Sequence, residues 1–366
     1  MIATDVAARP AGRAAPPAEP GSWREPPEPR AVLRAAGVEE AGIAAARLED
    51  LSRSHSVTLA ALPDGSAYVV KRVSRDAHAA GRSLAAELYA YRLASWRPEL
   101  ASVLPTAVHL DERRQVVALL AVPVEHLYPA QCLLPGFPSV DLAEALGRAL
   151  GSLHAATAGV PLLTVAGCGV VHLPDTPEED RLIGEGSAAA LAVTRAIVAD
   201  AVLAATLRRA AAVLRPSCLV HADVKWDNAV LDPGPPARVT LFDWELSGYG
   251  DPAWDVGAAL ADTVSLAVRL HGAQSVPADA VEWLDPPARA LLAAYAARTP
   301  AADHGFAERV SVCWVARMLH LALECASSAD DSDHPVVRGL LETAHRLAAQ
   351  CDAVIPAVLR ALTPKE

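Results

Sequence analysis

One stretch of the sequence, residues 219–257, constrains the fold more than any other. It reads LVHADVKWDNAVLDPGPPARVTLFDWELSGYGDPAWDVG. Two apolar segments, 229–231 and 239–242, flank a turn rich in Pro and Gly at 233–236, and this pattern predicts a β-hairpin. Polar residues precede the first segment and follow the second, so the hairpin would bring both sets to one edge.

The polar residues beside this hairpin are two acids and an amide. Asp223 and Asn228 precede the first strand, and Asp243 ends the second. Phosphoryl transfer needs a carboxylate beside the attacking hydroxyl, and an amide and a second carboxylate that hold Mg²⁺ on the phosphates. The pattern predicts Asp223 as the catalytic carboxylate and Asn228 and Asp243 as metal ligands. Alternatively, Asp223 and Asn228 are ordinary turn residues, because both types favour turns.

Three motifs carry a family resemblance: H-A-D-x-x-x-x-N at 221–228, F-D-W-E at 242–245 and G-D-P-x-x-D at 250–255. Together they resemble the aminoglycoside phosphotransferase and choline kinase family, small-substrate relatives of protein kinases. The family usually has H-G-D, and Ala222 in place of that glycine would be strained if the backbone needs a positive φ there. The resemblance implies that His221 and Asp255 support the catalytic loop, and that ATP and Mg²⁺ are the cofactors.

The same resemblance implies a two-lobed, protein-kinase-like α+β fold, with a small antiparallel-sheet N-lobe and a mostly helical C-lobe. We expect a flexible tail rich in Pro and Ala over residues 1–29 and a nucleotide-binding N-lobe over 30–122. The C-lobe, 123–366, would carry the catalytic loop, the metal ligands and the acceptor site. The 366 residues suffice for two domains, and their apolar content, mostly Ala and Leu with 4% aromatics, favours helix.

The N-lobe sequence predicts strands at 54–61 and 67–73, joined by a turn at 63–65. In a kinase-like lobe, Lys71 would reach the α- and β-phosphates, and Glu87, from a helix at 82–91, would hold it. The alternative is that both are solvent-exposed charges. No G-x-G-x-x-G loop occurs here, so the phosphates would be held by Ser54, Ser56 or backbone N–H groups.

Residues 103–110 and 116–122 predict two more strands, and a hinge between the lobes follows near 121–125. In the related kinases, the hinge backbone binds adenine. Pro123 has no N–H, so the donor would come from Val122 or Val124.

The rest of the chain predicts helices. Asp141 and Asp251 are expected N-caps of the helices that follow them, with Pro252 at the first helical position, and 187–214 reads as one long helix. His154 is expected to be a packed structural residue at a helix end. Further helices are expected at 30–36, 141–155, 285–297, 308–327, 336–350 and 354–362.

The composition narrows the partners and the compartment. The net charge of −11 argues against nucleic acid or an anionic membrane as a partner. The six cysteines form no CxxC pair, and no uninterrupted apolar run reaches membrane-spanning length. We therefore expect a soluble cytoplasmic protein.

The acceptor can be predicted only by class: a hydroxyl-bearing small molecule of the amino-sugar or amino-alcohol type. An acidic run at 330–333 could bind a cationic acceptor, although such runs are usually solvated loops. Trp314, Arg317 and His320 share one helical face, and Arg317 could instead meet an anion such as a phosphate or a peptide carboxylate.

Two other functions stay open. The V-K-W-D-N and D-W-E-L variants resemble relatives that phosphorylate Ser or Thr of ribosomal precursor peptides in lanthipeptide- or thioamitide-type natural-product biosynthesis, so that a partner lyase eliminates the phosphate. The other alternative is a catalytically silent nucleotide- or peptide-binding module. The presence of Lys71 together with Asp223, Asn228 and Asp243 disfavours that alternative.

Overall fold

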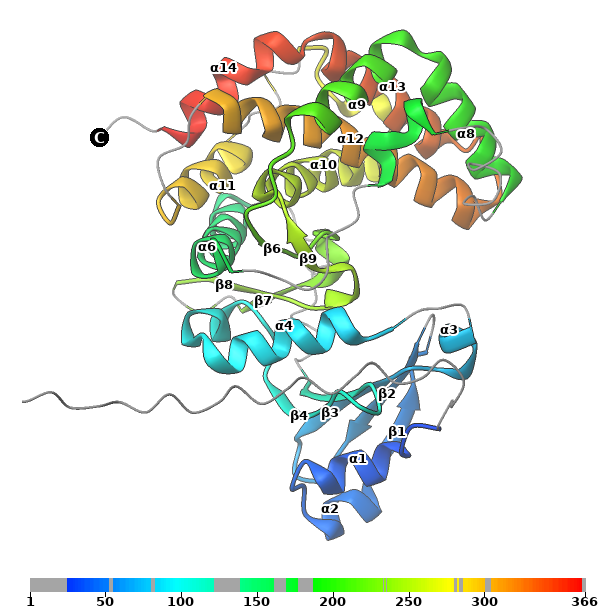
Figure 1. Cartoon of the computed structure of the whole chain (residues 1–366), viewed down its shortest axis with the longest axis vertical. Coiled ribbons are helices and arrows are strands. Elements are labelled where there is room, and N and C mark those ends of the chain that lie inside the picture. Colours follow the sequence, from blue (N-terminus) through cyan, green and yellow to red (C-terminus); the bar gives the residue numbers. More distant parts are fainter. Residues whose placement is uncertain are drawn as a thin grey trace, which may run out of the picture.

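The chain folds into two lobes, an N-terminal lobe with a five-stranded sheet and a larger helical C-terminal lobe (Figure 1). The computed structural model describes residues 25–52, 55–79, 83–121, 139–160, 169–176, 187–232, 234, 236–279, 282, 286–299 and 304–363. The predicted α+β kinase-like architecture is confirmed. Ser54, Val122, Val124 and most of the predicted tail lie outside the described residues.

The N-lobe sheet is antiparallel throughout, in the order β1-β2-β3-β5-β4. Its strands are β1 (Arg47–Asp50), β2 (Ser56–Ala61), β3 (Ala67–Arg72), β4 (Ala107–Asp111) and β5 (Val116–Leu120). Helices α1 (Pro29–Ala35), α2 (Glu40–Ala45), α3 (Arg75–Ala79) and α4 (Ala85–Trp96) complete the lobe.

Side-chain alternation in this sheet decides where Lys71 points. Val116 and Ala118 pack with Val32 and Leu33 of α1, whereas Val117 belongs to the core that includes α4. Val70 lies on the α1 side, so Lys71, its neighbour on β3 and the partner of Val117, faces α4.

One N-lobe prediction needs correction, and one strand was not predicted. The predicted strand at 103–110 begins only at Ala107, and a 3₁₀ helix, η1 (Pro98–Ser102), precedes it. Pro98 starts that helix, and Pro105 has no N–H to offer a neighbouring strand. Strand β1 was not predicted, because all four of its residues are exposed and show no apolar alternation.

The C-lobe is built around α12 (His304–Ala329), which packs against α10 (Pro252–His271) and α13 (Pro335–Ala349). Among the described residues, α12 is the one helix long and apolar enough to span a membrane by itself, but 72% of its apolar 18-residue window is buried inside the protein, as expected of a core helix. The other helices are α6 (Val140–Thr157), η3 (Gly169–Asp175), α8 (Ala188–Ala199), α9 (Ala201–Val213), η6 (Ala273–Ser275), α11 (Pro286–Ala296) and α14 (Cys351–Leu362).

Three predictions concern where helices begin or break; one is confirmed and two are wrong. Asp251 caps α10, with Pro252 at its first position, as predicted. The N-cap of α6 is Ser139, not Asp141, because the Ser139 side chain accepts a hydrogen bond from Leu142 N. The predicted single helix at 187–214 is two helices at 89°, broken where Asp200 caps α9 by accepting from Val202 N and Leu203 N.

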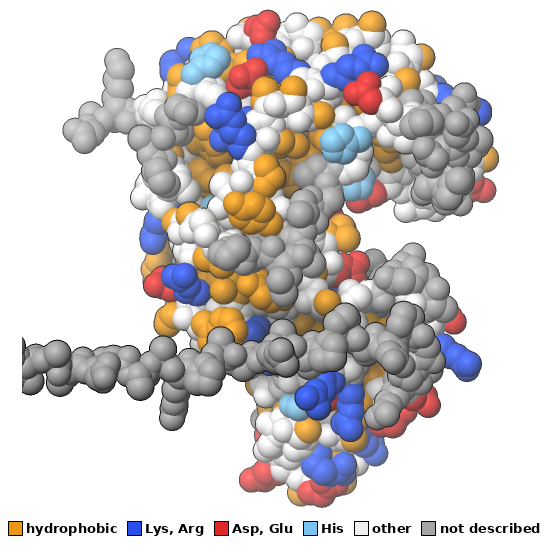
Figure 2. All heavy atoms as spheres, in the orientation of Figure 1, with side chains coloured by type: hydrophobic (Ala, Val, Ile, Leu, Met, Phe, Trp, Pro, Cys, Tyr) orange, Lys and Arg blue, Asp and Glu red, His pale blue; other side chains and the backbone are white. Residues whose placement is uncertain are grey.

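Two small strand pairs frame the loops between the lobes. The predicted hairpin forms from β7 (Ala229–Asp232) and β8 (Arg238–Leu241). The second pair, β6 (Cys218–Val220) with β9 (Gly248–Gly250), was not predicted. The 3₁₀ turns η4 (Trp226–Asn228) and η5 (Trp244–Leu246) complete the loops. In Figure 2 the molecule is deeply indented between the lobes, at the right of the view.

Candidate active site

One buried carboxylate, that of Asp255, fixes the backbone of the loop between β6 and η4. Asp255, in the first turn of α10, accepts hydrogen bonds from His221 N at 2.7 Å and from Ala222 N at 2.9 Å. His154 Nε2 lies 3.1 Å from the same carboxylate. Ala222 has a φ of 66°, the left-handed conformation in which an alanine is strained. Asp255 therefore fixes a turn that this sequence disfavours locally.

His221 ties this loop to the end of β8. Its Nδ1 lies 3.2 Å from Asp223 N, and its Nε2 lies 3.0 Å from Phe242 O. A backbone N–H must donate and a carbonyl must accept, so the geometry requires Nδ1 as acceptor and Nε2 as donor. The ring packs 4.7 Å from that of Trp244. The loop that carries Asp223 is thereby fixed beside Asp243.

Asp223 is a buried carboxylate with donors on both oxygens. Its Oδ2 accepts from Lys225 Nζ at 2.7 Å and from Asn228 Nδ2 at 3.0 Å. Its Oδ1 accepts from Arg317 Nη2 at 2.7 Å. Burial alone would raise the pKa of Asp223, but the charges of Arg317 and Lys225 outweigh it and hold that pKa below its usual value. We call Asp223, Lys225, Asn228 and Arg317 the acceptor-side cluster.

Lys71 reaches across from the N-lobe sheet to a set of carboxylates. Its Nζ lies 2.7 Å from Glu87 Oε2, 2.5 Å from Asp243 Oδ1 and 3.5 Å from Glu245 Oε2. Burial lowers the pKa of Lys71, but Glu87 and Asp243 more than compensate and raise it above its ordinary value. Lys71 and Glu87 are both buried, so they are not the solvent-exposed charges of the alternative interpretation. We call Lys71, Glu87, Asp243 and Glu245 the nucleotide-side cluster.

Asp243 and Asn228 lie at neighbouring backbone positions. Phe242 N donates to Asn228 O at 3.0 Å, and Asp243 then takes the left-handed conformation, with a φ of 64°. Asp accepts this conformation more readily than most residues do. Its side chain is 37% exposed, so one face of the carboxylate stays open to solvent while the other binds Lys71.

Three functional candidates, Glu245, Asp262 and Lys225, were missed or only partly predicted from the sequence. Glu245, two residues after Asp243, also lies 3.4 Å from His55 Nε2; the hydrogen bond from His55 and the charge of Lys71 lower its pKa against the effect of burial. The carboxylate of Asp262 accepts from Trp226 N, and burial raises the pKa of Asp262 to about 6. The D-W-E motif could have indicated Glu245, and the position of Lys225 inside the catalytic loop could have indicated Lys225. No feature of the sequence around Asp262 indicated its role.

The set predicted on one face of α12 divides in the structure. Trp314 is buried in the core, and His320 is half-buried, with Nδ1 2.9 Å from Arg317 Nη1. Arg317 does meet an anion, but that anion is Asp223 of the same chain rather than a ligand. The acidic residues Asp330, Asp331 and Asp333 are exposed beyond the end of α12, and Asp331 accepts from Asp333 N.

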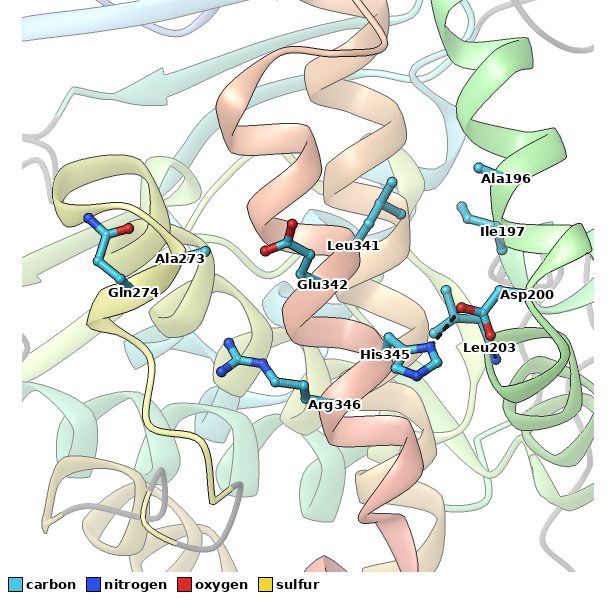
Figure 3. Close-up of a pocket in the computed structure, with 10 residues that line it drawn as sticks. All are labelled: Ala196, Ile197, Asp200, Leu203, Ala273, Gln274, Leu341, Glu342, His345 and Arg346. Carbon is cyan, nitrogen blue, oxygen red and sulfur yellow. Dashed lines mark hydrogen bonds and ion pairs between the residues drawn. The ribbon is translucent and has the colours of Figure 1, made fainter.

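Ser56 Oγ accepts from Arg72 Nη2 at 2.9 Å, which leaves its O–H free to donate, and its part in phosphate binding stays a prediction. A separate cleft of about 740 Å³ lies in the C-lobe between α8, α9, α13 and η6, where His345 pairs with Asp200 (Figure 3). None of the predicted site residues lines that cleft.

The nucleotide-side cluster fits a hard divalent cation. One lysine faces three carboxylates, so negative charge is in excess there. Within the described residues, no group of three His, Cys, Asp or Glu side chains could hold a metal by itself. Mg²⁺ is usually held by one or two carboxylates together with water and substrate phosphates, and Asp243, with Asn228 of the acceptor-side cluster, would be its protein ligands here.

Comparison with solved structures gives several relatives of the same architecture. They include an aminoglycoside phosphotransferase from Alicyclobacillus acidocaldarius (TM-score 0.56, 15% identity, covering 93% of this chain and 98% of that one). A choline/ethanolamine kinase family protein from Mesorhizobium loti has a TM-score of 0.53 and 18% identity, with 91% and 97% covered. An amicoumacin kinase in complex with AMP-PNP, Ca²⁺ and Ami has a TM-score of 0.54 and 14% identity, with 84% and 88% covered.

At these identities the likeness establishes the kinase-like fold. No curated protein sequence matches the chain. The family itself is decided by sequence, on a segment that includes both clusters except Arg317. Because the model of the phosphotransferase enzyme family matches residues 49–306, which is more than half of this chain, the chain belongs to that family.

Proposed function

We propose that this phosphotransferase moves the γ-phosphate of ATP to a hydroxyl of a small amino-sugar or amino-alcohol. The observation that supports this most is the pairing of two buried ionic clusters beside one hairpin. Lys71 reaches Asp243 from the N-lobe, and Asp223 lies in the loop that His221 ties to the residue before Asp243. Nucleotide phosphates and an acceptor hydroxyl have to meet between such groups.

On the nucleotide side, Lys71 would bind the α- and β-phosphates, and Glu87 would keep its ammonium in place. Asn228 donates through Nδ2 to Asp223, which leaves the amide oxygen of Asn228, Oδ1, as the atom that would bind a metal. Asp243 would supply the second ligand. Bound Mg²⁺ would neutralise charge on the phosphates.

On the acceptor side, Asp223 would accept a hydrogen bond from the substrate hydroxyl and aim its oxygen at the γ-phosphate. The low pKa of Asp223 makes it a weak base, which suits a loose transition state in which positioning matters more than early deprotonation. Lys225, 2.7 Å from Asp223 and partly exposed, is suited to stabilise the phosphoryl group in transit.

A Ser or Thr of a precursor peptide, acting with a partner lyase, is the second candidate acceptor. One observation favours it: both oxygens of Asp223 already accept from cations, Lys225 and Arg317, so this carboxylate offers little unpaired negative charge to a polycation. A cytoplasmic location belongs to both versions of the proposal.

The test is Mg·ATP turnover with products identified by mass spectrometry. One pool contains aminoglycosides and other amino-alcohols, and the other contains Ser/Thr-rich precursor peptides encoded beside the gene. A phosphorylated small molecule supports the first acceptor class. A phosphopeptide, or a dehydrated residue once a neighbouring lyase is added, supports the second. ATP binding without turnover in either pool would overturn the proposal in favour of a silent binding module.

A further inference from the structure

Arg317 lies in the middle of α12, far in sequence from the loop that it contacts. Its side chain has no exposed surface, and its Nη2 donates to Asp223 Oδ1 at 2.7 Å. Its Nη1 is directed to His320 Nδ1 at 2.9 Å and to Glu324 Oε1 at 3.4 Å. A fully buried guanidinium on the predicted catalytic carboxylate is not part of any motif that carries the family resemblance.

We propose that Arg317 is a positioning residue for phosphoryl transfer, because its guanidinium fixes the side-chain rotamer of Asp223. This inference rests on the proposed function, in which Asp223 receives the acceptor hydroxyl. Arg317 does not itself touch substrate, since it is fully buried. It acts by keeping Oδ1 of Asp223 engaged, so that Oδ2, which also accepts from Asn228 Nδ2 at 3.0 Å, is the oxygen that receives the acceptor hydroxyl when Lys225 moves away.

The close packing of α12 restricts the conformations that the Arg317 side chain can take. Its neighbours Ala316 and Met318 are fully buried. Helix α12 also lies close against α10: a Cβ on Gly257 would come within 2.7 Å of Trp314 N, so only glycine permits this approach. A guanidinium is always charged and has a planar fork of donors, so the contact persists at every physiological pH.

Lys225 provides the contrast on the same carboxylate. It binds Oδ2 at 2.7 Å, but its side chain is 27% exposed. It belongs to the flanking loop rather than to a buried helix. An arriving hydroxyl can therefore displace Lys225 from Oδ2, whereas it cannot displace Arg317 from Oδ1. The acceptor would approach Asp223 from the Lys225 side.

A matched control lies on the same helix. Arg309 Nε is 2.8 Å from Asp251 Oδ2, and the two side chains are 14% and 1% exposed. This buried Arg–Asp pair joins α12 to the N-cap of α10 and has no contact with Asp223. Replacing Arg309 measures the cost of losing such a pair without touching the acceptor-side cluster.

The experiment compares Arg317→Met, Arg317→Lys and Arg309→Met with the wild type. For the acceptor found in the turnover screen, we expect Arg317→Met to lower kcat about 100-fold with KM for ATP changed less than about threefold, since misplacing a catalytic group has effects of that size. Arg317→Lys should recover roughly a tenth of the wild-type kcat, because it keeps the charge but not the fork. Arg309→Met should lower thermal stability while kcat stays within about threefold of wild type.

Crystal structures of the variants give a readout that needs no turnover. In Arg317→Met, the Asp223 carboxylate should rotate toward Lys225 or take two conformers, with the backbone of 221–228 unchanged. An unmoved carboxylate would overturn the inference, as would equal losses of kcat in Arg317→Met and Arg309→Met. If Arg317→Met does not fold, the Arg317→Lys structure and kinetics decide in the same way. If the wild type transfers no phosphate, the proposed function fails, while the crystallographic comparison still decides whether Arg317 positions Asp223.

Discussion

The two clusters of the site are close to mirror images in charge. In the nucleotide-side cluster, one cation, Lys71, faces the three carboxylates of Glu87, Asp243 and Glu245. In the acceptor-side cluster, one carboxylate, Asp223, faces the cations Lys225 and Arg317. Both clusters are largely buried, so each central charge depends on its partners for solvation.

This difference indicates what each cluster would bind. Excess negative charge on the nucleotide side would be neutralised by a divalent metal arriving with the phosphates. On the acceptor side, Glu324 also lies 3.4 Å from Arg317, so the partly exposed Lys225 is the cation suited to stabilise the phosphoryl group as it crosses to the acceptor. The clusters share one backbone device, because a left-handed residue sets each key carboxylate: Ala222 precedes Asp223, and Asp243 takes the conformation itself.

The largest expected effect comes from removing the central charge of the acceptor side. Asp223→Asn should lower kcat by about 10³-fold or more, since the amide cannot accept the hydroxyl proton, while ATP binding stays nearly unchanged. Steady-state kinetics and calorimetric ATP titration measure the two quantities. Asp232→Asn, in the neighbouring hairpin and paired with the exposed Arg238, is the control and should behave as wild type. Undiminished turnover by Asp223→Asn would remove Asp223 from the mechanism.

The metal assignment of the nucleotide side is tested by Asp243→Asn. We expect the Kd for Mg·ATP to rise by about tenfold or more, because a ligand carboxylate is lost, while the Kd for ATP in EDTA changes less. Calorimetry with and without metal gives both constants. Equal changes in the two, or no change in either, would mean that Asp243 is not a metal ligand.

A pH experiment sharpens the account of the acceptor side, where Asp262 supports the catalytic loop through Trp226 N. Burial raises its pKa to about 6 in the folded protein, against about 4 in an unfolded chain. The folded state therefore binds this proton more tightly, and the stabilisation, present below pH 4, is lost as the pH rises through 6. Relative to wild type, Asp262→Asn should gain about 2 kcal/mol in free energy of unfolding between pH 4 and 7. Parallel curves for the two proteins would contradict the raised pKa.

The smallest effect concerns the left-handed turn. Ala222→Gly should raise the free energy of unfolding by about 0.5–1 kcal/mol, because the relief of strain at φ 66° exceeds the entropic cost of glycine. Urea unfolding measures it. Ala229→Gly, in β7 with an ordinary extended backbone, is the control and should destabilise. Loss of stability in Ala222→Gly would show that the turn is not strained.

The hairpin and the loops around it could be predicted because their signals are local. Apolar strands, a Pro/Gly turn and polar residues at fixed spacing all lie within 219–257. The possible strain at Ala222 was also visible there, and its positive φ was found. For Lys71 and Glu87 the sequence left two interpretations open, and the structure, which buries and pairs both side chains, excludes solvent-exposed charges; their roles stay predictions.

The rest depended on contacts between distant segments. Nothing near Arg317 in sequence indicates Asp223, because only the packing of α12 on α10 brings them together. Asp262 looks like any helical acid until Trp226 N is placed against it. The break at Asp200 was missed because the helical pattern on both sides outweighed one capping residue. The hinge predictions, Val122 and Val124, lie outside the described residues.

The ion pair between Lys71 and Asp243 joins a strand of one lobe to a turn of the other. If each group binds part of Mg·ATP, then in the free protein each serves as a substitute ligand for its partner. The nucleotide would have to compete with this internal contact, and its apparent affinity would be lowered by the fraction of molecules in which the pair is closed. The same contact would keep the two lobes close together between turnovers. The protein would therefore bind the nucleotide more weakly, but its site would already be assembled when the nucleotide arrives.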